Sequence, residues 1–143
     1  MQLNPYLLFA GNCEQAFKFY ERALGAKILS MMTHEQTPMA KQTAPEWQKK
    51  IIHGRIKIGD QIVMASDAPP DHHKPMQGFS VTLSVTTPAE AERLFNALAE
   101  KATTVTMPIQ ETFWAQRFGM LVDQFGTPWM INCEKAEQAR MAS

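Results

Sequence analysis

The sequence predicts an α+β fold of two tandem βαβββ modules, and three observations support that prediction. Two amphipathic helical patterns of the same design lie 75 residues apart. Each follows a short apolar strand and precedes an apolar strand that begins after a glycine turn. A stretch rich in proline, at 68–77, separates the halves. We therefore expect one domain with module one at 1–67, module two at 78–133 and a tail at 134–143.

The helix of the first module is predicted to follow an apolar strand at 6–9. Asn12 is a suitable N-cap, because its side chain can accept hydrogen bonds from first-turn amides. Apolar residues then recur on one helical face, at Ala16, Phe19, Tyr20, Ala23 and Leu24. Gly25 follows as a left-handed helix stop.

The second module repeats this arrangement after an apolar strand at 79–85. Thr87 is the predicted N-cap, Pro88 occupies the first helical position and Glu90 completes a capping box. The apolar face consists of Ala91, Leu94, Phe95, Leu98 and Ala99.

The ends of the two modules correspond as well. The segment 58–64 aligns with 125–131 at an offset of 67 residues, and a glycine turn leads into an apolar strand in both. The smaller offset places eight additional residues in the first half, and we assign them to the irregular stretch 34–48. His34 lies alone in this stretch, and we expect it to be solvated.

Composition excludes several classes of function. Fourteen basic and fourteen acidic residues balance, so no net field attracts nucleic acid or an anionic membrane. No apolar stretch approaches the length of a membrane helix, and no secretory signal is visible at the N-terminus. Cys13 and Cys133 belong to no motif, so we expect two reduced thiols in a cytoplasmic protein.

The segment 110–132 concentrates aromatic and charged residues. In one interpretation, an aromatic pocket holds an apolar or planar small molecule whose polar end is oriented by neighbouring side chains. The residues predicted to bind it are Gln110, Phe113, Trp114, Arg117, Trp129 and Asn132, together with His53 and Met64 from the first module.

A structural interpretation of the same segment stays open. Glu111, Arg117 and Asp123 would then form a buried charge network, with Trp114 and Phe118 as core residues. Asp123 is also predicted to form a turn with Gly126, because its side chain can bond the backbone that follows.

Several motifs of this chain resemble the PhnB-like family of the vicinal oxygen chelate superfamily, which includes glyoxalase I, bleomycin-resistance proteins and extradiol dioxygenases. The motifs are Pro5-Tyr6-x-x-Phe9-x-Gly11-Asn12, His53-Gly54, Met64-x-Ser66-Asp67, Gln110-Glu111-Thr112-Phe113-Trp114, Arg117-Phe118-Gly119 and Asp123-x-Phe125-Gly126-x-Pro128-Trp129-Met130-Ile131-Asn132. The resemblance implies a glyoxalase-like fold with curved mixed sheets around a cavity, and a homodimer. It implies no settled activity.

Metal-dependent members of the superfamily place His or Glu on the first and last strands of each module. The corresponding positions here are 4–6, 62–64, 79–81 and 129–131, and they contain no His, Asp or Glu. We therefore expect no metal and no cofactor. No GxGxG turn follows a strand, so the glycines do not predict an S-adenosylmethionine site.

Three functional hypotheses follow. The first is metal-free binding of a small organic or anionic molecule. The second is a lyase or isomerase of the glyoxalase or dioxygenase type, in which Glu111 or His53 is the general base, with or without a divalent metal. His53 also has a purely structural interpretation, as a hydrogen-bonded residue of the sheet. The third is a structural or regulatory domain without a ligand.

Overall fold

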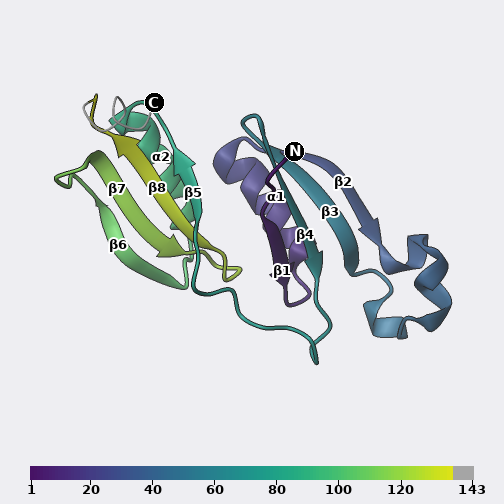
Figure 1. The fold of residues 1–143 in the computed structure, drawn as a ribbon. Coiled ribbons are helices and arrows are strands. Elements are labelled where there is room, and N and C mark those ends of the chain that lie inside the picture. Colours follow the sequence, from purple (N-terminus) through teal and green to yellow (C-terminus); the bar gives the residue numbers. More distant parts are fainter. Residues whose placement is uncertain (137–143) are drawn as a thin grey trace. The chain divides into compact units, whose positions relative to one another are not determined.

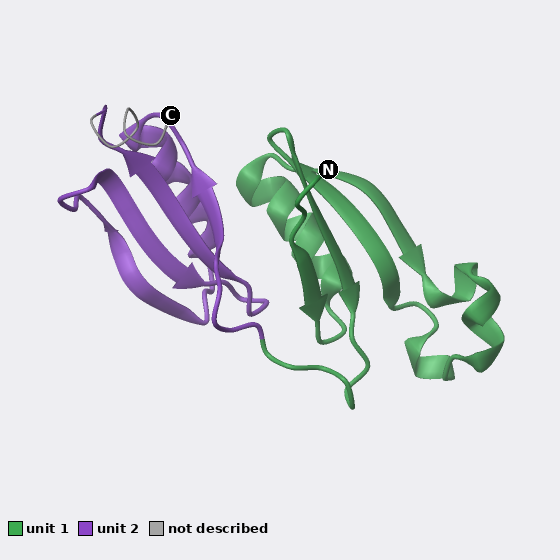
Figure 2. Ribbon diagram, viewed as in Figure 1, with its two compact units in different colours: residues 1–75 green, residues 76–143 purple. Residues whose placement is uncertain are grey.

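Two helices each cover one face of a four-stranded mixed sheet in the computed structural model, which describes residues 1–136 (Figure 1). The chain divides into unit 1, residues 1–75, and unit 2, residues 76–143 (Figure 2). The predicted tail at 134–143 begins inside the last strand, and its part at 137–143 lies outside the described residues.

Unit 1 has the predicted βαβββ order, and its sheet runs β1-β4-β3-β2. Strands β1 and β4 are parallel, and the other pairs are antiparallel. Its elements are β1 (Tyr6–Phe9), α1 (Cys13–Leu24), β2 (Lys27–Thr33), η1 (His34–Gln36), η2 (Pro38–Gln42), η3 (Pro45–Trp47), β3 (Ile51–Ile58) and β4 (Gln61–Asp67).

Unit 2 repeats the topology, with the sheet order β5-β8-β7-β6 and a parallel β5–β8 pair. Its elements are β5 (Val81–Ser84), α2 (Pro88–Leu98), β6 (Thr104–Gln110), β7 (Ala115–Val122) and β8 (Pro128–Glu134). The predicted duplication of a βαβββ unit is therefore confirmed.

The core of each unit lies between its helix and the covered face of its sheet. A glycine on the third strand of each unit allows the helix to approach closely. A Cβ added to Gly54 would lie 3.0 Å from Phe17 Cε2, and one added to Gly119 would lie 2.6 Å from Phe95 Cε2. The two glycines therefore hold equivalent places in their sheets, and each lies beneath a phenylalanine of its helix.

The start of α1 differs from the prediction. The Asn12 side chain makes no capping bond. Instead, Asp67 at the end of β4 accepts the Cys13 N–H and the Ile51 N–H through its two oxygens, each at 2.9 Å. A distant carboxylate thus replaces the local cap, because the fold brings β4 beneath the helix N-terminus. Gly25 ends the helix in the left-handed conformation as predicted, with φ 66°.

Helix α2 is capped by a residue at its own N-terminus, as predicted. The Thr87 hydroxyl accepts the Glu90 N–H at 3.2 Å, and Pro88 occupies the first turn. The second half of the predicted capping box does not form, because the Glu90 carboxylate pairs with Arg93 at 2.7 Å. A cation one helical turn away competes with the backbone for the carboxylate.

The stretch 34–48, predicted to be irregular, contains three short 3₁₀ helices. Gln48 stabilises them by donating its amide to the Ala40 and Thr43 carbonyls at 2.6 and 2.7 Å. The expectation that His34 is solvated is wrong, because both of its ring nitrogens are enclosed. Periodicity could not predict this segment, because runs of three to five residues contain no repeat.

The duplicated strands match with an offset of 66 residues rather than the predicted 67, so that Met64 corresponds to Met130. The predicted partner of Met130, Val63, is 4% exposed and faces the helix. The difference arises in the turns, because Gly59 and Asp60 join β3 to β4 whereas 123–127 join β7 to β8. A slip of one residue exchanges the two faces of a strand.

Both cysteines are buried free thiols. Burial raises the pKa of the Cys13 thiol above its ordinary value, and the neighbouring Asp67 carboxylate raises it further. Within residues 1–136, no helix is both long enough and apolar enough to span a membrane.

Candidate functional site

Each sheet has a second face, which its own helix does not cover, and we call it the open face of that unit. Residues paired across neighbouring strands share a face, so the register identifies its members. On unit 2 one row runs across all four strands: Ser84, Asn132, Phe118 and Gln110. The next row contains Thr82, Met130, Met120 and Met107. The open face of unit 2 is thus uncharged along both rows.

An aromatic cluster borders this face. The Trp114 ring packs edge-on against Phe118, with ring centroids 5.3 Å apart and an interplanar angle of 66°. Phe113 packs against Trp114 in turn, at 4.8 Å, but is 85% exposed. Such edge-to-face contacts add stability beyond burial alone and fix the ring orientations. Trp114 and Phe118 therefore offer an oriented apolar surface beside Asn132.

Asn132 contributes a hydrogen-bond acceptor without a partner. Its Oδ1 atom is enclosed, and no group among the described residues donates a hydrogen bond to it. An enclosed acceptor without a donor costs about 1–3 kcal/mol. Ser84 lies beside Asn132 on β5, and Phe118 lies beside it on β7. The open face of unit 2 therefore has an acceptor without a hydrogen-bond donor, the Oδ1 atom of Asn132, next to an aromatic surface.

The predicted ligand-binding residues divide between the two faces of the unit 2 sheet. Gln110, Trp114 and Asn132 gather on the open face, with Phe113 at its border. Arg117 and Trp129 do not join them.

Trp129 is 1% exposed, and its indole nitrogen donates to Asp123 Oδ2 at 2.8 Å. It is a core residue on the helix side of the sheet, because its cross-strand partner is the buried Leu121 of β7. Trp129 therefore does not share a face with Trp114 and Asn132, contrary to the single aromatic pocket that the sequence suggested. Strand parity places it opposite Asn132, three residues away, once the register is known.

Arg117 pairs across the sheet with the buried Cys133, so it too lies on the helix side. Its guanidinium donates to Glu92 Oε1 of α2 at 2.8 Å and to the Gln116 carbonyl at 2.7 Å. The hydrogen bond to Glu92 raises the pKa of Arg117. Arg117 thus ties strand to helix, which agrees with its structural interpretation.

The predicted charge network of Glu111, Arg117 and Asp123 does not form as a contact cluster. The Glu111 side chain is 65% exposed and pairs with Lys135 at 3.3 Å, while Asp123 is buried. Asp123 accepts the Phe125 and Thr127 amides at 2.8 and 3.0 Å, which confirms the predicted turn. Glu111 therefore lacks the apolar surroundings that a carboxylate base requires.

The open face of unit 1 carries a different set of groups. Tyr6, Met64, Arg55 and Ser30 form one row, and His53 pairs with Met32 beside it. The Tyr6 hydroxyl lies 3.1 Å from His53 Nδ1, and the two rings stack with centroids 5.7 Å apart. Sequence reasoning missed Arg55 and Tyr6, although Arg55 follows His53 by two residues and strand parity places them on one face.

The donor set of these faces does not fit a metal ion. The open-face side chains on the first and last strands of each unit are aromatic, aliphatic, thioether, hydroxyl or amide groups, apart from Glu134 at the end of β8. Among residues 1–136, no group of three His, Cys, Asp or Glu side chains lies close enough to hold an ion. A single carboxylate does not replace the hydration shell that a divalent cation loses.

Comparisons with known proteins agree with this architecture. Residues 2–131 match the Glyoxalase/Bleomycin resistance protein/Dioxygenase superfamily. Protein YjdN of Escherichia coli is 37% identical to this chain, in an alignment that covers 96% of this chain and 98% of YjdN.

Two solved structures extend the comparison. Protein PA1353 from Pseudomonas aeruginosa is 44% identical, with a TM-score of 0.84 over 94% of this chain and 98% of that one. A PhnB protein from Bacillus cereus, described as a putative 3-demethylubiquinone-9 3-methyltransferase, is 21% identical, with a TM-score of 0.76 over 93% and 99% of the two chains. The predicted resemblance is confirmed, and the PhnB protein shows the same fold.

Proposed function

The chain belongs to the Glyoxalase/Bleomycin resistance protein/Dioxygenase superfamily, and from that premise we propose that it binds a small organic molecule on the open face of unit 2 without a metal. The observation that carries this proposal is the enclosed, unpartnered Oδ1 of Asn132 beside the oriented rings of Trp114 and Phe118. A ligand there is planar or apolar, and it presents an N–H or O–H group to Asn132.

The surrounding residues support this choice of ligand. Met120 and Met130 form the neighbouring row, and their flexible thioethers adapt to varied apolar shapes. Gln110 lies beyond Phe118 and is exposed, so it is available to a polar end of the ligand. Because Arg117 is bound to Glu92, the described residues of unit 2 offer no guanidinium on this face for an anionic group. A neutral hydrogen-bond donor therefore fits better than an anion.

A matched pair of probes tests the proposal. Indole and benzofuran have the same shape, but only indole carries an N–H donor. We expect indole to bind about tenfold more tightly, because it alone satisfies Asn132. Titration of the wild-type protein, followed by the side-chain amide signals of asparagine in NMR spectra, measures both affinities. Equal affinities of indole and benzofuran would show that Asn132 does not accept a hydrogen bond from the ligand. If neither probe binds saturably, a domain without a ligand would be favoured.

Asn132→Leu provides the corresponding variant. It removes the unmet acceptor, so we expect the preference for indole to disappear while thermal stability is kept or increased. Asn96→Leu is the matched control, since Asn96 is an exposed residue of α2. A preference that persists in Asn132→Leu would place the site elsewhere.

A second candidate function rests on the Tyr6–His53 contact at 3.1 Å. A hydrogen-bonded imidazole and phenol are suited to proton transfer, and Arg55 on the same face is suited to an anionic substrate. We propose this pair, rather than Glu111, as the acid–base centre if the protein is a lyase or isomerase. Deuterium exchange into dihydroxyacetone in D₂O would then occur in wild type and be lost in His53→Gln. No exchange above buffer in the wild-type protein would argue against this function for such α-hydroxy ketones.

The homodimer implied by the family resemblance stays a prediction. Sedimentation equilibrium of the purified protein would check it.

A further inference from the structure

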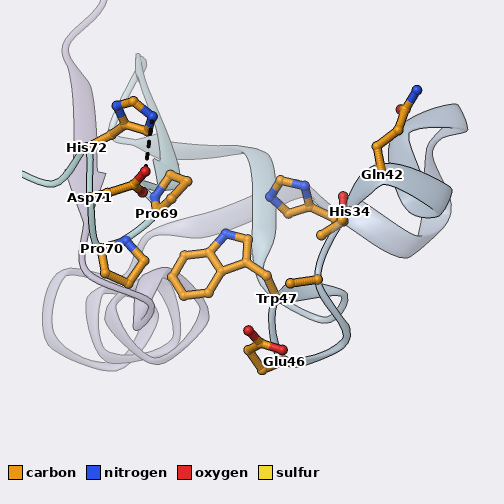
Figure 3. Close-up of a pocket in the computed structure, with 10 residues that line it drawn as sticks. His34, Gln42, Glu46, Trp47, Pro69, Pro70, Asp71 and His72 are labelled. Carbon is orange, nitrogen blue, oxygen red and sulfur yellow. Dashed lines mark ion pairs between the residues drawn. The ribbon is translucent and has the colours of Figure 1, made fainter.

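A pocket of about 470 Å³ lies in unit 1, away from the rows that form its open face. The 3₁₀ segment between β2 and β3 forms one side, and the residues after β4 form the other (Figure 3). Its volume falls within the range of small-molecule sites. The described lining residues are His34, Gln42, Thr43, Ala44, Glu46, Trp47, Pro69, Pro70, Asp71 and His72.

The indole of Trp47 is a fixed wall of this pocket. Lys50 lies over the indole, with its Nζ atom 5.9 Å from the ring centroid, and the same ammonium donates to the Gly11 carbonyl at 2.7 Å. A Cβ added to Gly11 would lie 3.6 Å from the indole, so the backbone also packs against it. In Figure 3 the indole lies between Pro70 and His34. Indole and proline rings together form flat apolar walls, which suit a planar ligand.

The segment that carries Trp47 is an ordered structure. The His34 and Glu35 amides donate to the Lys50 and Gln48 carbonyls at 3.1 and 2.9 Å. The Thr37 hydroxyl donates to the His34 carbonyl at 2.8 Å. These bonds close the segment on itself, so the pocket wall is held before any ligand arrives.

Unmet hydrogen-bonding capacity is concentrated at this wall. The indole nitrogen of Trp47 and both ring nitrogens of His34 are enclosed, and none has a partner among the described residues. Buried polar atoms are nearly always paired in folded proteins, so three such atoms on two adjoining side chains require an explanation. The indole N–H can only donate, so its partner must offer an acceptor, and water that a ligand orders in the pocket can supply one.

The charged residues that line the pocket indicate the charge of the ligand that it would bind. Glu46 and Asp71 contribute exposed carboxylates, and Asp71 lies 3.6 Å from His72. No lysine or arginine is among the described residues that line the pocket. Lys50, whose ammonium lies over the indole, is held by the Gly11 carbonyl and is not among these lining residues. A cation therefore gains from the two carboxylates while its aromatic part packs on the indole, whereas an anion gains nothing from the charged groups of the lining.

We propose that this pocket is a binding site for a planar aromatic cation, which stacks on Trp47 and directs its charge toward Glu46 and Asp71. The site is independent of the open face of unit 2, which is uncharged along its two rows and carries the proposed function. Failure of either proposal leaves the other unaffected.

Three probes of one shape test the proposal: benzamidinium, benzamide and benzoate, which are cationic, neutral and anionic. The indole N–H signals of the three tryptophans serve as reporters in ¹H–¹⁵N NMR spectra, assigned by Trp→Phe variants. We expect benzamidinium to shift the Trp47 signal saturably, and to bind about tenfold more tightly than benzoate. Equal binding of benzoate, or a shift confined to Trp114 or Trp129, would overturn the proposal.

Removing the carboxylates sharpens the test. Glu46→Gln combined with Asp71→Asn should weaken benzamidinium about fivefold and leave benzamide unchanged. The control pair, Glu35→Gln with Asp60→Asn, removes the same charge from exposed positions outside the lining. Equal losses in both double variants would indicate a general charge effect and would contradict a site at this pocket.

Discussion

Units 1 and 2 have the same topology but differ in how each helix begins and in what each open face carries. Helix α1 begins against Asp67, which lies 54 residues further along the chain, whereas α2 begins at its own Thr87. The open face of unit 1 carries Tyr6, His53 and Arg55, while that of unit 2 is aromatic and uncharged along its two rows. One backbone plan is thus stabilised by different interactions and presents different chemistry.

This comparison shows which features a duplicated fold retains. Both units keep the sheet order and the helix-facing glycine on which a phenylalanine packs, although the two phenylalanines come from different turns of their helices. Close packing of helix and sheet depends on this backbone geometry. The open faces are less constrained, because no helix of their own unit packs on them. They are therefore the places where the two units differ in the side chains that they present.

The largest expected difference between the units concerns their helix starts. Asp67→Ala leaves two buried N–H groups without an acceptor, so we expect a loss of about 3 kcal/mol in the free energy of unfolding. Thr87→Ala removes one local cap and should cost about 1 kcal/mol. Urea unfolding followed by circular dichroism measures both. Asp67→Asn, which keeps one acceptor oxygen, should fall between wild type and Asp67→Ala, and equal losses for Asp67→Ala and Thr87→Ala would break the comparison.

The paired glycines should differ by a smaller amount. A methyl group at Gly119 meets Phe95 at 2.6 Å and the Ile109 backbone at 3.1 Å, whereas one at Gly54 meets Phe17 at 3.0 Å and otherwise only ordinary contacts. We expect Gly119→Ala to lower the free energy of unfolding by about 2 kcal/mol, and Gly54→Ala by less than about 1 kcal/mol. Thermal unfolding of both variants measures these losses of stability. A larger loss in Gly54→Ala than in Gly119→Ala would contradict the prediction.

The smallest expected effect concerns Arg117, whose structural and ligand roles the sequence left open. Because its guanidinium is bound to Glu92 on the helix side, Arg117→Ala should lower Tm by no more than about 3 °C and leave indole affinity unchanged. Arg93→Ala is the matched control, since Arg93 pairs with Glu90 on the surface of the same helix. If Arg117→Ala lost indole affinity and Arg93→Ala did not, Arg117 would have to contribute to the binding site.

The sequence alone determined the order of elements, the two helical faces and the duplication, because these follow from local periodicity and from turn residues. Thr87, Gly25 and the Asp123 turn were predictable for the same reason, since each acts within about four residues of its partner. The family resemblance was also present in the sequence, as contiguous motifs. The 3₁₀ segment was not predictable, because its stabilising bonds depend on Gln48 reaching back over five to eight residues.

Tertiary structure decided which of the candidate residues share a surface. The position of a side chain on one face or the other depends on strand register, and a shift of one residue exchanges the faces. For this reason Trp129 and Arg117 lie on the helix side of the sheet and not in the expected pocket, whereas Phe118 and Arg55 lie on the open faces. It is also why the Asp67 cap and the Trp47 pocket were invisible in the sequence, because each joins segments at least 16 residues apart that only folding brings into contact.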